Sequence, residues 1–177
     1  MTSKDDFLPG EPEGSSRYLN MKALKSMKDR TARIRILSPF ITGHVKFGAD
    51  KKPRRIRDDG AFPEDVVWGQ SLDGKEQVSR RFWACAVFNY AVGAEQVWEF
   101  TQGSIHGKLK ALINDEDWGI PTGYDIKLKS TGEGMETEYS VLPVGKAPLA
   151  PGVLASWTAL KESWWGLDAL YSGNDPF

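Results

Sequence analysis

Two runs of alternating apolar and polar residues lie between Tyr124 and Leu142, separated by a glycine-containing turn. Tyr124–Lys129 (YDIKLK) alternates in one direction, Ser130–Gly134 (STGEG) has turn chemistry, and Glu136–Leu142 alternates back. A period of two is typical of a strand with one buried face, and a short glycine-containing connection is typical of a hairpin. The sequence therefore predicts an antiparallel strand pair here.

A second strand pair is predicted upstream. Phe82–Tyr90 and Gln96–Thr101 have strand length, and Ala91–Glu95 between them has hairpin length and contains a glycine. Thr31–Leu37 (TARIRIL) alternates two arginines with two isoleucines, which predicts a strand with the isoleucines in the core and both guanidinium groups on the opposite face. Ser104–Asn114 carries apolar residues at helical spacing and is predicted to be a helix.

The faces of the strand that begins at Phe82 decide which of its rings could bind a ligand. Alternation places one set of side chains together: Arg81, Trp83, Cys85, Val87 and Asn89. Because this set contains an arginine and an asparagine, we expect it to face outward, with Trp83 exposed as a stacking surface. Phe82 and Phe88 are then expected in the core. On the next strand, Trp98 and Phe100 are expected to point inward.

The predicted order is strand, long insertion, strand, strand, helix, strand, strand. A five-stranded OB barrel with one helix between strands three and four has this order. The insertion covers residues 43–79, with one short strand at His44–Phe47, and its turn-rich part Lys51–Gly60 cannot be a central strand. We therefore predict a mainly β protein: an OB-fold barrel with a long insertion after strand one and a C-terminal helix.

Three regions are predicted along the chain. Residues 1–17 form a disordered acidic arm, residues 18–146 the OB-fold domain, and residues 147–177 a linker, an amphipathic helix over Val153–Tyr171 and a short tail. No apolar stretch reaches the roughly 18 residues of a membrane span, so no membrane association is expected. The single cysteine, Cys85, excludes an internal disulfide and is typical of a reducing compartment, so we expect a cytoplasmic protein.

Charge is unevenly distributed along the chain. Between Lys22 and Arg57, twelve basic residues face two acidic ones, whereas Ala111–Tyr139 has seven acidic and two basic residues. Such asymmetry indicates an anionic partner more than it indicates a fold. Single-stranded nucleic acid needs cations along its phosphates and aromatic rings against its bases. The candidates for these roles are Arg33, Arg35, Lys46, Arg54, Arg55, Arg57, Trp68, Arg80, Arg81, Trp83, Lys127, Lys129 and Tyr139.

The sequence patterns that could indicate a catalytic or metal-binding site are weaker than the pattern that indicates nucleic-acid binding. The acidic cluster Asp115–Asp117 follows the predicted helix, where a solvated cap is more common than an acid–base pair. His44, Cys85 and His106 have no metal-ligand spacing, so neither a metal nor another cofactor is expected. We therefore expect a protein that is not an enzyme, with the role of accessory subunit of a nucleic-acid enzyme as an alternative.

The C-terminal region suggests a further alternative. Its predicted helix is rich in tryptophan, and its tip NDPF combines an acid, a proline, a terminal aromatic ring and a carboxylate. The candidate partner-binding residues are Trp157, Trp164, Asp175 and Phe177. Through them the chain could act as an adaptor or structural protein, or associate with itself.

Two motifs in the second half of the chain also occur together in a known family. Asp117–Asp125 (DWGIPTGYD) is followed by Gly132–Tyr139 (GEGMETEY), within a run that extends from Val97 to Pro143. In these motifs the chain resembles bacteriophage single-stranded DNA-binding proteins of the OB type. The resemblance covers roughly residues 80–143 and extends weakly to the ARIRIL strand.

This resemblance implies a function. It implies sequence-independent coating of single-stranded DNA during phage replication, recombination or repair, in the cytoplasm of the host cell. The tip Asn174–Phe177 is similar to the acidic Asp-x-Pro-Phe ends of bacterial single-strand binders, which implies recruitment of replication or recombination proteins. It differs from those ends in being only slightly acidic.

Overall fold

The computed structural model describes residues 17–164 and 166–177. The predicted disordered segment at residues 1–17 therefore lies outside the described residues, except for Arg17. The strands are β1 (Tyr18–Leu19), β2 (Thr31–Ile36), β3 (Ile41–Phe47), β4 (Pro53–Ile56), β5 (Arg80–Asn89), β6 (Ala94–Phe100), β7 (Tyr124–Thr131) and β8 (Glu138–Lys146). The α-helices are α1 (Gly103–Asn114) and α2 (Pro151–Ser163). The 3-10 helices are η2 (Met21–Ser26), η3 (Lys28–Arg30), η4 (Pro121–Gly123), η5 (Gly134–Glu136) and η6 (Leu167–Ser172).

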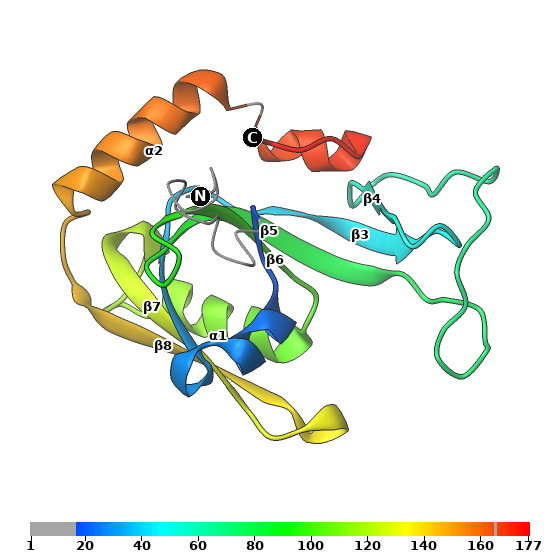
Figure 1. Cartoon of the computed structure of the whole chain (residues 1–177), viewed down its shortest axis with the longest axis horizontal. Coiled ribbons are helices and arrows are strands. Elements are labelled where there is room, and N and C mark those ends of the chain that lie inside the picture. The colour runs from blue at the N-terminus through cyan, green and yellow to red at the C-terminus, as the bar shows by residue number, and fades with distance from the viewer. Residues whose placement is uncertain (1–16, 165) are drawn as a thin grey trace, which may run out of the picture.

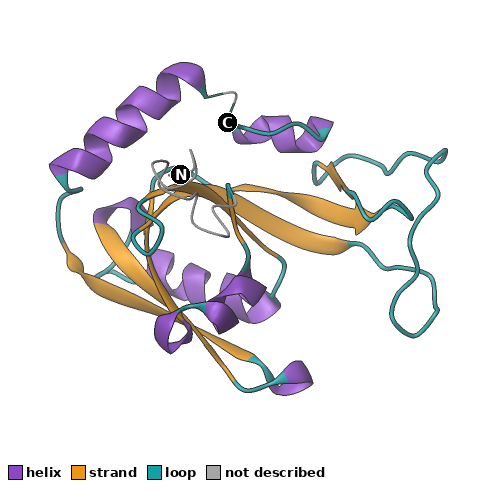
Figure 2. Ribbon diagram, viewed as in Figure 1, coloured by secondary structure: helices purple, strands orange, loops and turns teal. Residues whose placement is uncertain are grey.

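The described residues form a mixed, open sheet of eight strands with few helices, so the prediction of a mainly β protein is confirmed (Figures 1 and 2). The main path through the sheet is β1-β6-β5-β2-β7-β8. The pair β1–β6 is parallel, and the other pairs are antiparallel. The long strand β5 pairs with β2 near its C-terminal end and with β3 near its N-terminal end.

The closed barrel predicted from the sequence is not shown, because the sheet is open. Closure would require β6 to pair with β8, but the outer edge of β6 pairs with β1 instead. Helix α1 connects β6 to β7 and contacts β8. Both predicted hairpins, the strand at Thr31–Leu37 and the helix between the hairpins are present.

The predicted insertion contains more regular structure than one short strand. β3 extends to Ile41, and β4 pairs antiparallel with it as an outer strand, which is a position that tolerates Pro53. We call β3, β4 and residues 57–79 the arm, and the rest of the sheet together with α1 the body. The arm extends to one side of the body (Figure 1). At its base, a Cβ on Gly43 would lie 2.1 Å from the carbonyl oxygen of Ile56, so only glycine allows β4 to approach there.

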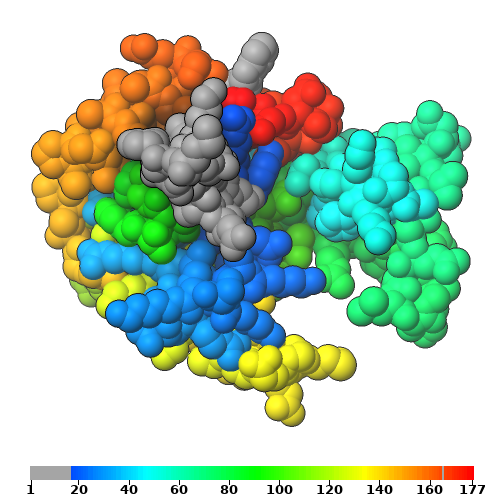
Figure 3. Space-filling model, viewed as in Figure 1, coloured from blue at the N-terminus to red at the C-terminus, as the bar shows by residue number. Residues whose placement is uncertain are grey.

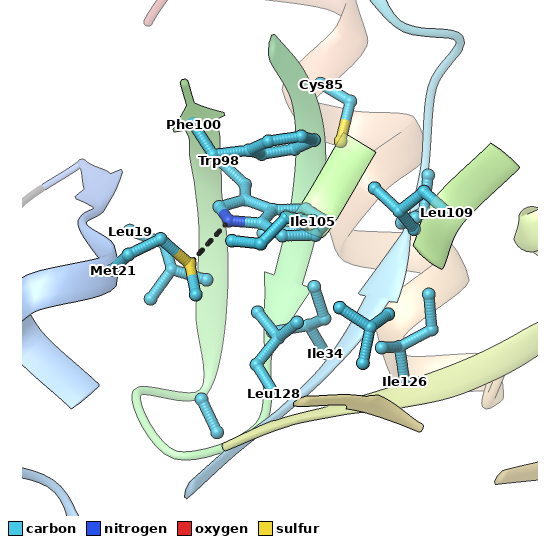
Figure 4. Packing of buried hydrophobic residues seen from close by; sticks show 14 of the residues in the cluster. Leu19, Met21, Ile34, Cys85, Trp98, Phe100, Ile105, Leu109, Ile126 and Leu128 are labelled. Carbon is cyan, nitrogen blue, oxygen red and sulfur yellow. Dashed lines mark hydrogen bonds between the residues drawn. The ribbon is translucent and has the colours of Figure 1, made fainter. Parts of the chain in front are cut away.

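The main core lies on the face of β5 that we predicted to be outward. Cys85 and Val87 are fully buried with Ile34 and Trp98, and Figure 4 shows several of these side chains converging around the Trp98 indole. The register explains this placement, since Cys85 lies directly opposite Trp98 and must share its face. Trp98 and Phe100 do point into the main core as predicted, so the assignment of the β5 faces is wrong.

A second apolar cluster covers the other face of the same strands. Phe82 and Val97 are fully buried there against Leu167 and Leu170 from η6. Phe82 is therefore buried as predicted, but in this cluster and not in the main core. Both faces of β5 are covered, so the polar residues in its sequence do not identify a solvent-exposed side.

The prediction of one helix over Val153–Tyr171 is wrong beyond Ser163. Helix α2 ends there, and η6 starts at Leu167 after Gly166, whose φ of 85° suits a glycine. The break turns the chain, so that residues 166–177, which we call the C-terminal segment, pack on the second cluster. None of the helices in the described ranges combines the length and apolar character that a membrane crossing needs.

Candidate nucleic-acid interface

An open groove of about 2010 Å³ lies between the arm and the body. The arm contributes β3, β4 and the loop that leads into Arg80, and the body contributes β1 and the end of β6. The C-terminal segment and Met135, at the tip of the β7–β8 hairpin, complete the lining. Figure 3 shows the surface hollowed between the arm and the body.

The groove lining is rich in cations but contains acids as well. Its basic residues are Lys22, Lys52, Arg54, Arg55, Lys75 and Arg80, and its acidic residues are Asp73, Glu76, Glu99 and Asp175. Arg55 is held by Glu99, with Nε 2.5 Å from Oε2, and Arg54 by Asp50 at 3.1 Å. Arg80 is exposed and forms no ion pair with any described residue. Of these arginines, Arg80 is the most available to a phosphate.

The other candidates on the arm, and Arg81 beside it on β5, contact residues that stabilise the arm. Lys46 Nζ lies 4.5 Å from the centre of a Trp68 ring, in a cation–π contact. Arg81 pairs with Asp58 at 3.2 Å. Arg57 lies 4.3 Å from the Tyr171 ring, and so ties the arm to the C-terminal segment. These four candidates lie outside the groove lining.

Four candidates lie on β2 and β7, away from the groove. Lys127 and Lys129 are exposed, as predicted. Arg35 is on the expected face but is only 3% exposed, so its predicted availability to phosphate is wrong. Its Nε donates to Asp125 at 2.6 Å, and its remaining nitrogens donate to the carbonyls of Thr122 and Ala147. Arg35 therefore links β2 to the start of β7 and to the residue that follows β8, and its guanidinium is not available to a phosphate.

Arg33 and Asp125 complete this buried network. Arg33 binds the second carboxylate oxygen of Asp125 at 2.7 Å and remains 47% exposed, while the Tyr90 hydroxyl donates to the first oxygen. Burial alone would raise the pKa of Asp125, but the hydrogen bonds from Arg35 and Arg33 outweigh it and hold that pKa below its ordinary value. The acid is therefore ionised at neutral pH.

Trp83 and Tyr139 pack against the main core, so Trp83 is not the exposed stacking surface that we predicted. The Trp83 ring stacks on His106, with centroids 4.9 Å apart and planes inclined by 17°, and lies 5.3 Å from Phe40. Burial lowers the pKa of His106, which favours the neutral ring in this stack. Trp83 is covered because β5 turns this face inward.

The four predicted partner-binding residues contact other parts of the same chain. Trp157 is buried, and its ring meets Trp164 edge to face at 5.2 Å. Trp164 in turn meets Phe177 at 5.2 Å. Arg17 pairs with Asp175 at 3.2 Å and lies over the Phe177 ring. The tip is therefore docked on its own chain and does not project as a free peptide.

One residue at the groove was missed in the sequence. Phe47 is 49% exposed at the end of β3 and lines the groove. The alternation in HVKF places Val45 and Phe47 on one face and His44 and Lys46 on the other. Of these residues, only Lys46 was among the predicted candidates. The exposed apolar side chains Leu72, Val78 and Met135 also line the groove.

The described part of the chain contains no group of three or more histidine, cysteine or acidic side chains placed to hold a metal ion. No protein-family model, curated protein or solved structure matches this chain.

Proposed function

We propose that this protein binds single-stranded DNA without regard to sequence, as a non-catalytic coat in phage replication or recombination, and that the strand lies in the groove between arm and body. The observation that carries the proposal is the composition of the groove. It places exposed cations beside exposed apolar and aromatic side chains along one continuous surface. Unpaired strands require this combination, because phosphates bind cations and bases stack on rings.

The arrangement of the strands supports an OB-like reading of the sheet. In this reading β2 and β3 together are strand one, and β5, β6, β7 and β8 are strands two, three, four and five. Strand one then pairs with strands two and four, strand two pairs with strand three, and strand four pairs with strand five. OB barrels are commonly partly open, which agrees with the absence of pairing between the described strands three and five.

The position of the groove supports the same proposal. OB proteins bind oligonucleotides on strands two and three, between the loop that follows strand one and the loop that follows strand four. The groove is lined by the end of β6, by β4 and residues 57–79 of the arm, which occupy the first loop position, and by Met135 from the second. Part of the outer face of β5 and β6 is covered by η6, so the ligand would lie beside the C-terminal segment.

Titration of fluorescein-labelled oligothymidine with the full-length protein tests this function. Fluorescence anisotropy should rise to saturation at low salt, and the affinity should fall steeply as salt increases, because each phosphate contact on a single strand contributes about 0.7 to the log–log slope. A random-sequence oligonucleotide should bind with similar affinity, and a duplex of the same length more weakly. Absence of binding at low salt would rule out the proposed function.

A further inference from the structure

Phe47 and Arg80 lie close together on the same wall of the groove. Val45 is directly opposite Arg80 in the β3–β5 register, so Phe47, two residues further along β3, shares the face of Arg80. Diagonal neighbours of this kind have Cα atoms about 7–8 Å apart, within reach of long side chains. Pro53 lies directly opposite Phe47 on β4 and lines the groove beside it.

The backbone that carries Phe47 is held on both sides. Its N–H donates to Oε1 of Gln77 at 2.6 Å. Its carbonyl oxygen accepts from Nε2 of Gln77 at 2.8 Å and from the N–H of Gly69 at 3.0 Å. The ring nevertheless remains half exposed and has no aromatic neighbour in stacking range among the described residues. An aromatic ring that is fixed at its base and open on its face loses little conformational freedom when a base stacks on it.

We propose that Phe47 and Arg80 form one nucleotide subsite, in which a base stacks on the Phe47 ring and an adjacent phosphate pairs with the Arg80 guanidinium. The inference rests on the proposed function and adds which residues of the groove contact the base and the phosphate. Two observations carry it: the single exposed ring on this wall has a fixed backbone, and the cation beside it has no acidic partner among the residues described. Trp83, the ring that sequence reasoning favoured, is covered by His106 and Phe40.

The two side chains should respond differently to salt. Phe47→Ala is expected to weaken oligothymidine binding by about 5- to 150-fold, the range for one lost base stack, with the salt dependence unchanged. Phe47→Leu, which keeps apolar bulk without a flat ring, should weaken binding nearly as much, and Phe47→Trp should restore it. Arg80→Gln should reduce the log–log salt slope by about 0.7, the contribution of one phosphate contact.

Two controls match these changes outside the groove. Ile120→Ala removes an apolar side chain that is 75% exposed, and Lys146→Gln removes an exposed cation on β8. Both should leave affinity and slope unchanged. Wild-type binding by Phe47→Ala or by Phe47→Leu, or an unchanged slope in Arg80→Gln, would overturn the subsite while leaving single-strand binding intact. Failure of the wild-type protein to bind any oligonucleotide would instead remove the proposed function on which the subsite rests.

Discussion

Replacing Arg35 with methionine is expected to lower the free energy of unfolding by about 3–5 kcal/mol, the usual cost of removing one partner from a buried ion pair. Arg35 and Asp125 are both almost fully buried, and the guanidinium satisfies the acid and two backbone carbonyls at once. Methionine has a similar length but cannot donate. The variant would leave Asp125 with Arg33 and Tyr90 as side-chain partners, and the carbonyls of Thr122 and Ala147 without this donor.

Arg33→Met is the matched control, because Arg33 binds the same carboxylate from an exposed position. Its loss should cost about 0–1 kcal/mol, as for other exposed pairs. Urea denaturation followed by circular dichroism measures both values. Equal losses in the two variants would contradict the structural role of Arg35, and a small loss in both would show that the buried network does not stabilise the sheet.

The loss of stability caused by Arg35→Met should also depend on pH. The pKa of Asp125 lies below its ordinary value in the folded protein, so the carboxylate contributes stability above about pH 4, and this is lost as pH falls through the folded pKa. Without Arg35, Asp125 loses the first of the hydrogen bonds that lower its pKa, so this pKa should be higher in the variant than in the wild type. The variant should then lose less stability than the wild type on acidification, and the stability gap between them should narrow below about pH 4. A gap that stays constant down to pH 3 would contradict this assignment.

Leu170→Ala is expected to lower the free energy of unfolding by about 2–5 kcal/mol, as for other fully buried leucines. Leu170 is 2% exposed in the second cluster, where it packs with Val45 and Phe82 at the base of the arm. Its neighbour Tyr171 donates a hydrogen bond to the carbonyl of Thr42 at 2.5 Å. The C-terminal segment is therefore a part of the folded unit that supports the arm.

Leu154→Ala on α2 is the control, because the Leu154 side chain is about half exposed at 51%. It should change stability by no more than about 0.5 kcal/mol. If Leu170→Ala and Leu154→Ala have the same small effect in thermal or urea unfolding, the C-terminal segment is not packed on the sheet. The tip would then be available as the partner-binding peptide that its sequence suggests.

The two hairpins and the helix between them could be predicted because each carries its own local signal, whereas β1 and β4 were not predicted. Alternation and glycine-containing turns identified β5–β6 and β7–β8, and helical spacing identified α1. The faces of β5 could not be assigned in the same way. Two apolar clusters cover opposite sides of this strand, and the second is completed by Leu167 and Leu170, which are far away in sequence.

The candidate site was predicted in part for similar reasons. Arg54, Arg55 and Arg80 do line one groove. Arg33 and Arg35, however, have the same place in the alternating pattern of their strand. Only the position of Asp125 on β7 makes Arg35 buried and leaves Arg33 exposed. Phe47 was missed because its signal is one aromatic residue within a turn-rich insertion. Its exposure depends on the β3–β4 pairing and on Gln77, thirty residues later in the chain.

Photocrosslinking locates the bound strand most directly. Full-length protein is irradiated with oligothymidine that carries 4-thiothymidine, digested, and the crosslinked peptides are mapped by mass spectrometry. A strand in the groove should crosslink to the residues that line it, namely 45, 47, 52–56, 69–73, 75–80 and 99–102. Crosslinks confined to the outer faces of β2 and β7, around Arg33 and Lys127, would show that the strand binds elsewhere and would contradict the account of the groove.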